Sequence, residues 1–263
     1  MHRSKLGLLA LCIAALSVMA FAANSASAAE WLILTKAGAV KTAKELKASI
    51  VAELEPKTDG TLLTHLLGLS IGVLCTAATL EGASLEGGGK VSSGGKVVFT
   101  GCTVVEEPKG TALANCTVSN PGGTAGTVAS KEGKGQLQTN GETLIESNTT
   151  VEEAGKKVGV FAELKFAGTE CPLTSLGTTP VKGVFWIKDC ELNAKKESRI
   201  VEHLEKHLIV ESTAHGHTLW LGANNAEHLE TSVDGSALAL LANSEVEKKL
   251  IEHAGLAWGA TLP

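Results

Sequence analysis

The sequence has few aromatic residues. Tyrosine is absent, and phenylalanine and tryptophan together make up 3% of the 263 residues. Surfaces that bind carbohydrate, or that resemble antibody paratopes, depend on exposed aromatic rings. The few rings of this chain are needed to fill its interior, so the composition argues against an exposed aromatic binding face.

The chain also lacks an excess of positive charge. Its formal net charge is −5, and its lysine pairs, such as Lys156-Lys157 and Lys195-Lys196, lie close to glutamate. A moderately acidic surface repels nucleic acid and anionic membranes. We therefore exclude both as partners and interpret the lysine pairs as parts of a solvated surface.

Motifs that carry catalysis are missing or incomplete. There is no C-x-x-C, which removes support for a redox or zinc-ribbon motif. The glycine runs at 87–90 and 94–96 lack the spacing of a phosphate-binding loop, and the acidic pairs at 106–107 and 152–153 have no aromatic platform for a sugar. Gly68-Leu-Ser70-Ile-Gly72 matches G-x-S-x-G, but Ser70 falls inside an apolar run, whereas a nucleophile elbow needs a strand, a turn and a helix. The sequence favours a protein that is not an enzyme.

The first 28 residues are typical of a secretory signal peptide. Arg3 and Lys5 precede an uncharged stretch from Leu6 to Ala23, and Ala26-Ser27-Ala28 offers a cleavage site. Cleavage there leaves 235 residues and, with two basic residues lost, a net charge of −7. An uncleaved segment that tethers the protein is the alternative. We predict a signal peptide at 1–28, a single β-rich domain at 29–263 and a secreted, extracellular protein.

Five cysteines remain after cleavage, and export favours disulfides. Cys102 and Cys116 are close in sequence and flank a polar loop, so they are the first predicted pair. Cys75–Cys171 is the second predicted pair, with Cys171–Cys190 as the alternative. The odd count leaves one cysteine over.

What the sequence does contain is short β-branched runs separated by turn-forming residues. Trp31-Leu-Ile-Leu is a predicted first strand, and Val158–Phe166 alternates between two faces. Asn140-Gly141 predicts a tight hairpin turn between two further strands. The pattern indicates an all-β fold in a single domain, an antiparallel sandwich or a barrel-like fold with one or two short helices.

Two segments are candidates for those helices. Ile200, Leu204 and Leu208 recur at helical spacing within residues 197–211, although a long strand is equally compatible with the surrounding pattern. Ser244-x-x-Glu247 fits a capping box and predicts a short helix that ends before Gly255.

The histidines form the one cluster of potential metal ligands. If residues 200–208 are helical, His203 and His207 share a face, and His215 and His217 would share a face of a strand. Imidazole nitrogens at such spacing can bind Zn²⁺ or Cu²⁺. The spacing matches no established zinc motif, and exposed histidines on a polar surface are the simpler explanation. Metal content after dialysis would decide between the two.

Several segments carry a resemblance that covers nearly the whole mature chain. They include GVLC at 72–75, VFTGC at 98–102, NCTVSNPGG at 115–123, FAELKF at 161–166 and a terminal AGLAWGA. In these the chain resembles a group of uncharacterised, secreted, β-rich proteins with four cysteines from soil bacteria. The resemblance implies a β fold, a bridge at Cys102 and an extra cysteine at Cys190, and it carries no assigned activity.

Two functions remain open at this point. The first is a secreted, non-catalytic binding or structural protein of the cell envelope or the extracellular space, with no cofactor and with cell-envelope components as possible partners. The second is a secreted metal-binding protein that uses His203, His207, His215 and His217. The sequence identifies no ligand for the first.

Overall fold

The structure is a computed structural model. It describes residues 29–35, 39–45, 48–54, 60–66, 69–107, 109–190, 192, 199–200, 206–215, 218–221, 229–234, 236–241, 244–246, 249–251 and 256–262. The predicted signal peptide lies outside these residues.

The first half of the described chain forms the following strands: β1 (Glu30–Leu34), β2 (Val40–Thr42), β3 (Ala48–Leu54), β4 (Gly60–Leu66), β5 (Leu69–Glu81), β6 (Ala83–Glu86), β7 (Lys90–Glu106), β8 (Thr111–Ala112), β9 (Thr117–Ser119), β10 (Thr127–Ala129) and β11 (Gly133–Leu137). The second half forms β12 (Glu142–Ser147), β13 (Thr150–Glu153), β14 (Lys156–Ala167), β15 (Thr178–Asp189), β16 (Arg199–Ile200), β17 (Lys206–Glu211), β18 (Leu219–Leu221), β19 (Leu229–Asp234), β20 (Ser236–Leu241), β21 (Ser244–Val246), β22 (Lys249–Ile251) and β23 (Trp258–Thr261). Two short 3₁₀ helices, η1 (Pro172–Leu176) and η2 (Thr213–His215), complete the elements.

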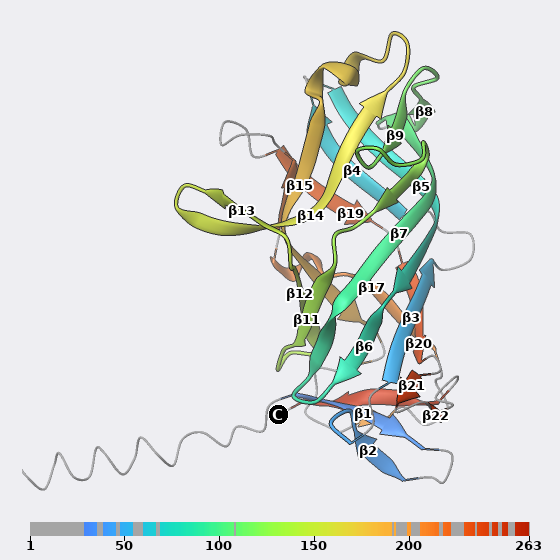
Figure 1. Cartoon of the computed structure of the whole chain (residues 1–263), viewed down its shortest axis with the longest axis vertical. Helices are drawn as coiled ribbons and strands as arrows, with labels where there is room; N and C mark the ends of the chain where they lie inside the picture. The colour runs from blue at the N-terminus through green and yellow to red at the C-terminus, as the bar shows by residue number, and fades with distance from the viewer. Residues whose placement is uncertain are drawn as a thin grey trace, which may run out of the picture.

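The fold is all-β, which confirms the predicted class. Most of the strands form one closed barrel, shown in Figure 1 with its long axis vertical. Its longest pairing joins β5 to β7 in antiparallel register, from Ile71 opposite Glu106 to Glu81 opposite Lys96. The predicted Asn140-Gly141 turn joins β11 to β12, and Gly141 takes a positive φ of 87°.

A small second sheet lies at the lower end of the barrel in Figure 1. Its strand order is β16-β23-β1-β2, so it pairs the first described strand with the last, with Trp31 opposite Ala260 and Ile33 opposite Trp258. The first of these strands, β1, matches the strand predicted from Trp31 to Leu34. We call this element the end sheet, because its buried side chains pack against residues of the barrel wall.

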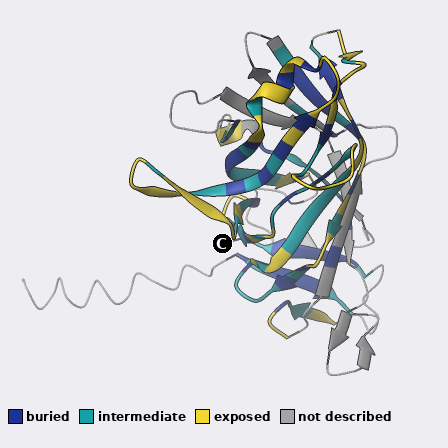
Figure 2. Ribbon diagram, turned by 45° about the horizontal axis from the view of Figure 1, so that its top comes forward, coloured by how far each residue is buried: buried dark blue, intermediate teal, exposed yellow. Residues whose placement is uncertain are grey.

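The buried side chains of the described residues form two clusters. The upper cluster surrounds the disulfides and includes Val104, Leu164 and Phe166. The lower cluster joins Trp31 and Trp258 of the end sheet to barrel residues that include Ile50, Leu85 and Ala239. Figure 2 shows the contrast with the β13–β14 hairpin, which stands away from the wall and is mostly exposed.

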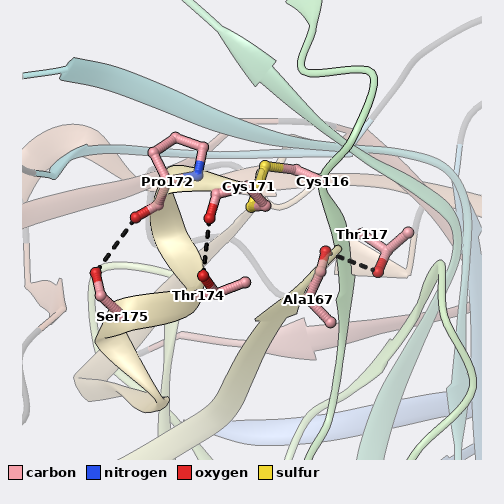
Figure 3. The surroundings of a disulfide bond; sticks show 7 residues. All are labelled: Cys116, Thr117, Ala167, Cys171, Pro172, Thr174 and Ser175. Atoms are coloured by element: carbon pink, nitrogen blue, oxygen red, sulfur yellow. Dashed lines mark hydrogen bonds between the residues drawn. A yellow bond between two sulfur atoms is a disulfide. The ribbon is translucent and has the colours of Figure 1, made fainter. Parts of the chain in front are cut away.

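The disulfides correct the predicted pairing. The bridges are Cys75–Cys102 and Cys116–Cys171, and Cys190 is exposed and lies outside both. Cys75 is directly opposite Cys102 in the β5–β7 ladder. Cys116 immediately precedes β9, which pairs with the end of β14 close to Cys171 (Figure 3). The predictions Cys102–Cys116, Cys75–Cys171 and Cys171–Cys190 were wrong because strand register, and not closeness in sequence, sets the partners.

Where the structure describes them, neither of the two candidate helical segments is helical, and for 197–211 the strand alternative holds in the described residues. Arg199–Ile200 and Lys206–Glu211 are strands β16 and β17, and Ser244–Val246 pairs with Lys249–Ile251 as a small hairpin. In each segment pairing with neighbouring strands overrides the local helical pattern. The helices of the described residues, η1 and η2, are single short turns in connections between strands. Among the described residues no helix has the length and apolarity needed to cross a membrane.

Candidate functional site

The main candidate site is a cavity of about 220 Å³ inside the barrel. It lies between the two clusters of buried side chains and is partly open to solvent. Trp31 and Trp258 border it from the end sheet, and Phe99, Phe161 and Phe185 border it from the wall. Five of the scarce aromatic residues therefore border one space, whereas Phe166, Trp186 and Trp220 do not.

Strand alternation explains the composition of the lining. Successive side chains of a strand point to opposite faces of the sheet. In β15 the residues Phe185, Ile187 and Asp189 border the cavity, while the intervening Trp186 and Lys188 do not. In β15 the lining is therefore the inward-facing set of the strand, whereas β5 and β17 also contribute consecutive residues, and most of the lining is hydrocarbon.

Small residues leave the cavity open. Ala78 of β5 and Ala239 of β20 are buried and border the cavity on either side of β3, and Gly95 borders the same space from β7. Larger side chains at these positions would fill the interior, as side chains do in most small barrels. An engineered apolar cavity of about 150 Å³ in another protein stays dry and binds benzene-sized molecules, so a space of this size is large enough for a small ligand.

Two polar groups of the lining lack partners. The indole nitrogens Nε1 of Trp31 and Trp258 are buried, and neither donates a hydrogen bond to an acceptor in the described part of the chain. The residues themselves are 3% and 2% exposed, and their ring centroids lie 5.9 Å apart. A buried N–H without a partner costs about 1–3 kcal/mol. The two indoles belong to a mainly apolar lining that also includes Asp189 and Glu211.

His207 is not part of the lining but lies against Trp258, which borders the cavity. Its Nδ1 lies 2.7 Å from Oδ2 of Asp189, and its ring stacks on Trp258 with centroids 3.9 Å apart. Because an ionised carboxylate only accepts, Nδ1 carries the hydrogen that is donated to Asp189. The other nitrogen, Nε2, is buried without a partner among the described residues. The contact ties β17 and β15 to the end sheet.

His215 occupies a different environment, in η2 on the outer side of the wall. Its ring stacks on Trp186 with centroids 3.8 Å apart, and its Nε2 lies 2.7 Å from Oε2 of Glu142. Glu142 also accepts hydrogen bonds from Ser212 and from Asn140 Nδ2. Ser212 bonds to the carboxylate and not to the imidazole, so the group lacks the nucleophile–base contact of a catalytic triad. It is a clamp that fastens η2 to β12.

The Glu142 clamp has an expected pH dependence. Burial raises the pKa of Glu142, but the hydrogen bonds from Ser212, His215 and Asn140, with the charge of His215, outweigh it and bring the pKa below its ordinary value of 4.5. A pKa that is lower in the folded state stabilises the fold above pH 4.5, and this contribution is lost as the pH falls through the folded value. The clamp therefore weakens in acid.

Replacing Glu142 with glutamine should lower the free energy of unfolding by about 1–3 kcal/mol at neutral pH, because the amide leaves a buried donor without its acceptor. Below pH 4.5 the free energy of unfolding of the variant should also fall less than that of the wild-type protein. Urea titrations between pH 3 and 7 measure both. Glu146→Gln is the matched control: Glu146 is on the same strand, is half exposed and meets Lys134 at 3.5 Å, so it should cost less than about 1 kcal/mol. Equal effects of the two substitutions would contradict the clamp.

The structure places the two described histidines in separate contacts. His207 faces Asp189 and Trp258, whereas His215 faces Glu142 and Trp186. His203 and His217 lie outside the described residues. Among the residues that are described, no group of three or more histidine, cysteine, aspartate or glutamate side chains could hold a metal ion. The predicted four-histidine site stays a prediction.

Ser70, the serine of the G-x-S-x-G match, lies within strand β5 opposite His65 of β4. The sequence analysis placed it in a strand, and the structure agrees. It has none of the strand–turn–helix geometry that exposes a nucleophile.

The sequence analysis did not find the cavity. The one feature of the sequence that relates to the cavity is a set of small residues that border it. Closure of the barrel decides which way their side chains face, so the sequence alone does not show that they leave a space. Comparison of the chain with protein-family models, with curated proteins and with solved structures finds no match. The arguments for function therefore come from the geometry of this chain.

Proposed function

We propose that this protein is a secreted, non-catalytic binding protein that holds a small apolar molecule in the cavity of its barrel. The cavity of about 220 Å³ between the two buried clusters carries the proposal. Ligand sites in proteins are concave, mostly apolar and supplied with a few polar groups. This cavity has that composition.

The extracellular location is supported by two disulfides, which form and persist in oxidising compartments. The 28-residue leader adds support from the sequence. Cell-envelope components remain the proposed surroundings, because a secreted carrier of an apolar molecule meets lipids and cell-wall material there.

The absence of catalysis is part of the same proposal. Ser70 is enclosed in a strand pairing, and Ser212 has a carboxylate and not a base as its partner. A buried pair such as His207–Asp189 holds the structure together when no nucleophile is next to it. The metal-binding alternative of the sequence analysis would need His203 and His217, and zinc or copper content after dialysis tests it.

Filling the cavity tests the proposal. Ala78→Leu places a larger side chain in the inward-facing position opposite Phe99 of β7. Extra methylene groups in occupied space typically cost about 1–3 kcal/mol, which for a bound ligand is a loss in affinity of about 5- to 150-fold. Tryptophan fluorescence during titration with 2-octanone or benzene measures the affinity.

Ala77→Leu is the control for this substitution. Ala77 is the neighbouring residue of the same strand and is exposed, so its side chain points away from the cavity. It should leave the affinity unchanged. Equal losses in both variants, or no binding of any apolar probe to the wild-type protein, would contradict the proposed function.

A further inference from the structure

We infer that two phenylalanine side chains, Phe99 and Phe161, form a partition across the interior of the barrel and set the length of the apolar ligand that the cavity accepts. The main cavity ends at these two rings, and a second, smaller cavity lies beyond them. This inference rests on the proposed function and adds to it the residues that select the ligand by the length of its chain.

The first support is the second cavity. It has a volume of about 30 Å³ and lies within the upper cluster, where Val73 and Leu164 border it. Of the described residues, Phe99, Phe161 and Gly60 border both this small cavity and the main cavity. Because glycine has no side chain, the two phenylalanine rings are the side chains that separate the two spaces.

The position of Phe99 in the sheet agrees with this role. Phe99 of β7 is opposite Ala78 of β5 on one side and opposite Val128 of β10 on the other. Directly opposite residues of paired strands lie on the same face of the sheet. Ala78 borders the main cavity, and Val128 borders the small cavity. The Phe99 side chain therefore points into the barrel at the boundary between the two spaces.

Phe161 reaches the same boundary because strand β14 has a β-bulge there. The register against β15 moves from Val160 opposite Lys182 to Ala162 opposite Val181. Phe161 is therefore the extra residue of the bulge. Bulges re-aim a side chain and are frequent beside functional sites. In a regular strand Phe161 and Ala162 would point to opposite faces, whereas here both border the small cavity.

The surroundings of the two rings fit a boundary that a ligand meets. Phe99 and Phe161 are only partly buried, although both lie against the upper cluster, because they also face open space. The ring centroid of Phe161 is 5.8 Å from that of Phe185, which borders the main cavity but not the small one. The three phenylalanines close one end of the main cavity, so an apolar chain that fills it stops there.

The test compares ketones of increasing chain length, from 2-hexanone to 2-undecanone, by calorimetry. Each methylene that enters apolar space should raise the affinity about fourfold. For the wild-type protein the rise should stop at the length that fills the main cavity. Phe161→Ala removes one ring of the partition, so the rise should continue for about two more carbons, a gain of about 16-fold over wild type for the longest ketone.

Val128→Ile shows whether the added length enters the small cavity. Val128 borders that cavity and not the main one, and isoleucine adds one methylene to it. In the wild-type protein this substitution should leave every affinity unchanged. In the Phe161→Ala protein it should weaken the longest ketone about fourfold. Phe185→Ala is the matched control, because it removes an equal ring from the main cavity alone. Adding Val128→Ile to that variant should have no effect.

Two milder variants, Phe161→Leu and Phe99→Leu, open the same partition and should each extend the rise by about one carbon, so poor folding of Phe161→Ala leaves them to decide. The partition is wrong, and the proposed function stands, if ketones bind but the limiting length is the same in all three variants. The same holds if wild-type affinity rises through the whole series, or if Val128→Ile acts equally on the wild-type and Phe161→Ala proteins. If neither a ketone nor benzene binds the wild-type protein, the proposed function fails and this inference fails with it.

Discussion

Replacing both Cys116 and Cys171 with alanine should lower the free energy of unfolding by about 4 kcal/mol. The bridge closes a loop of 55 residues, and in the chain-entropy treatment a cross-link of this span removes that much conformational freedom from the unfolded chain. Both cysteines are buried in the upper cluster. Thr174 Oγ1 donates to Cys171 O at 2.8 Å, and Thr117 Oγ1 donates to Ala167 O at 3.2 Å (Figure 3).

The second bridge provides the comparison. Cys75–Cys102 closes a loop of 27 residues, so its removal should cost about 3.5 kcal/mol on the same argument. It also links two strands that are already paired along most of their length. Denaturant titrations of the two double-alanine variants measure both values. A larger loss for the Cys75–Cys102 variant would contradict the loop-length argument.

Peptide mapping of the oxidised protein tests the pairing itself. It should recover Cys75 linked to Cys102 and Cys116 linked to Cys171. A peptide that links Cys102 to Cys116 would restore the pairing expected from sequence and would contradict the register of β5 and β7.

Trp258→Ala is expected to be the most damaging single substitution, with a loss of about 3–5 kcal/mol. Trp258 is 2% exposed, stacks on His207 and contacts Trp31, so it joins the end sheet to the barrel wall. Its removal enlarges the cavity and leaves the imidazole of His207 without its stacking partner. Thermal and urea denaturation measure the loss.

Trp186→Ala is the matched control. Trp186 also stacks on a histidine, His215, but its ring is only partly buried and lies on the outer side of the wall. Its removal should cost less than half as much as that of Trp258, because less apolar area leaves contact with protein. Similar losses would mean that the end sheet does not depend on Trp258.

The fold class was predictable because its signals are local. Alternating residues between 158 and 166 anticipated β14 (Lys156–Ala167), and Asn140-Gly141 anticipated the turn between β11 and β12. These patterns depend on neighbours in sequence. The end sheet was only half predictable: Trp31 belongs to an expected strand, but nothing local shows that this strand pairs with the one that contains Trp258.

The site could not be predicted because its determinants are non-local. Whether Ala78, Asp189 or Glu211 faces inward depends on strand register and on closure of the barrel. The same holds for His207 and His215, which are eight residues apart in the printed sequence and lie in different environments. The cysteine pairing failed for this reason as well, since Cys75 and Cys102 meet only when β5 and β7 are in register.

The most direct measurement is a crystal structure of the protein under xenon pressure, because xenon occupies apolar cavities and avoids polar, hydrated ones. We expect xenon density in the space bordered by Trp31, Trp258 and Phe99, with no water bound to the indole nitrogens. An interior filled by a chain of ordered waters, or a collapsed barrel with no room for xenon between the two clusters, would contradict an apolar binding site in this protein.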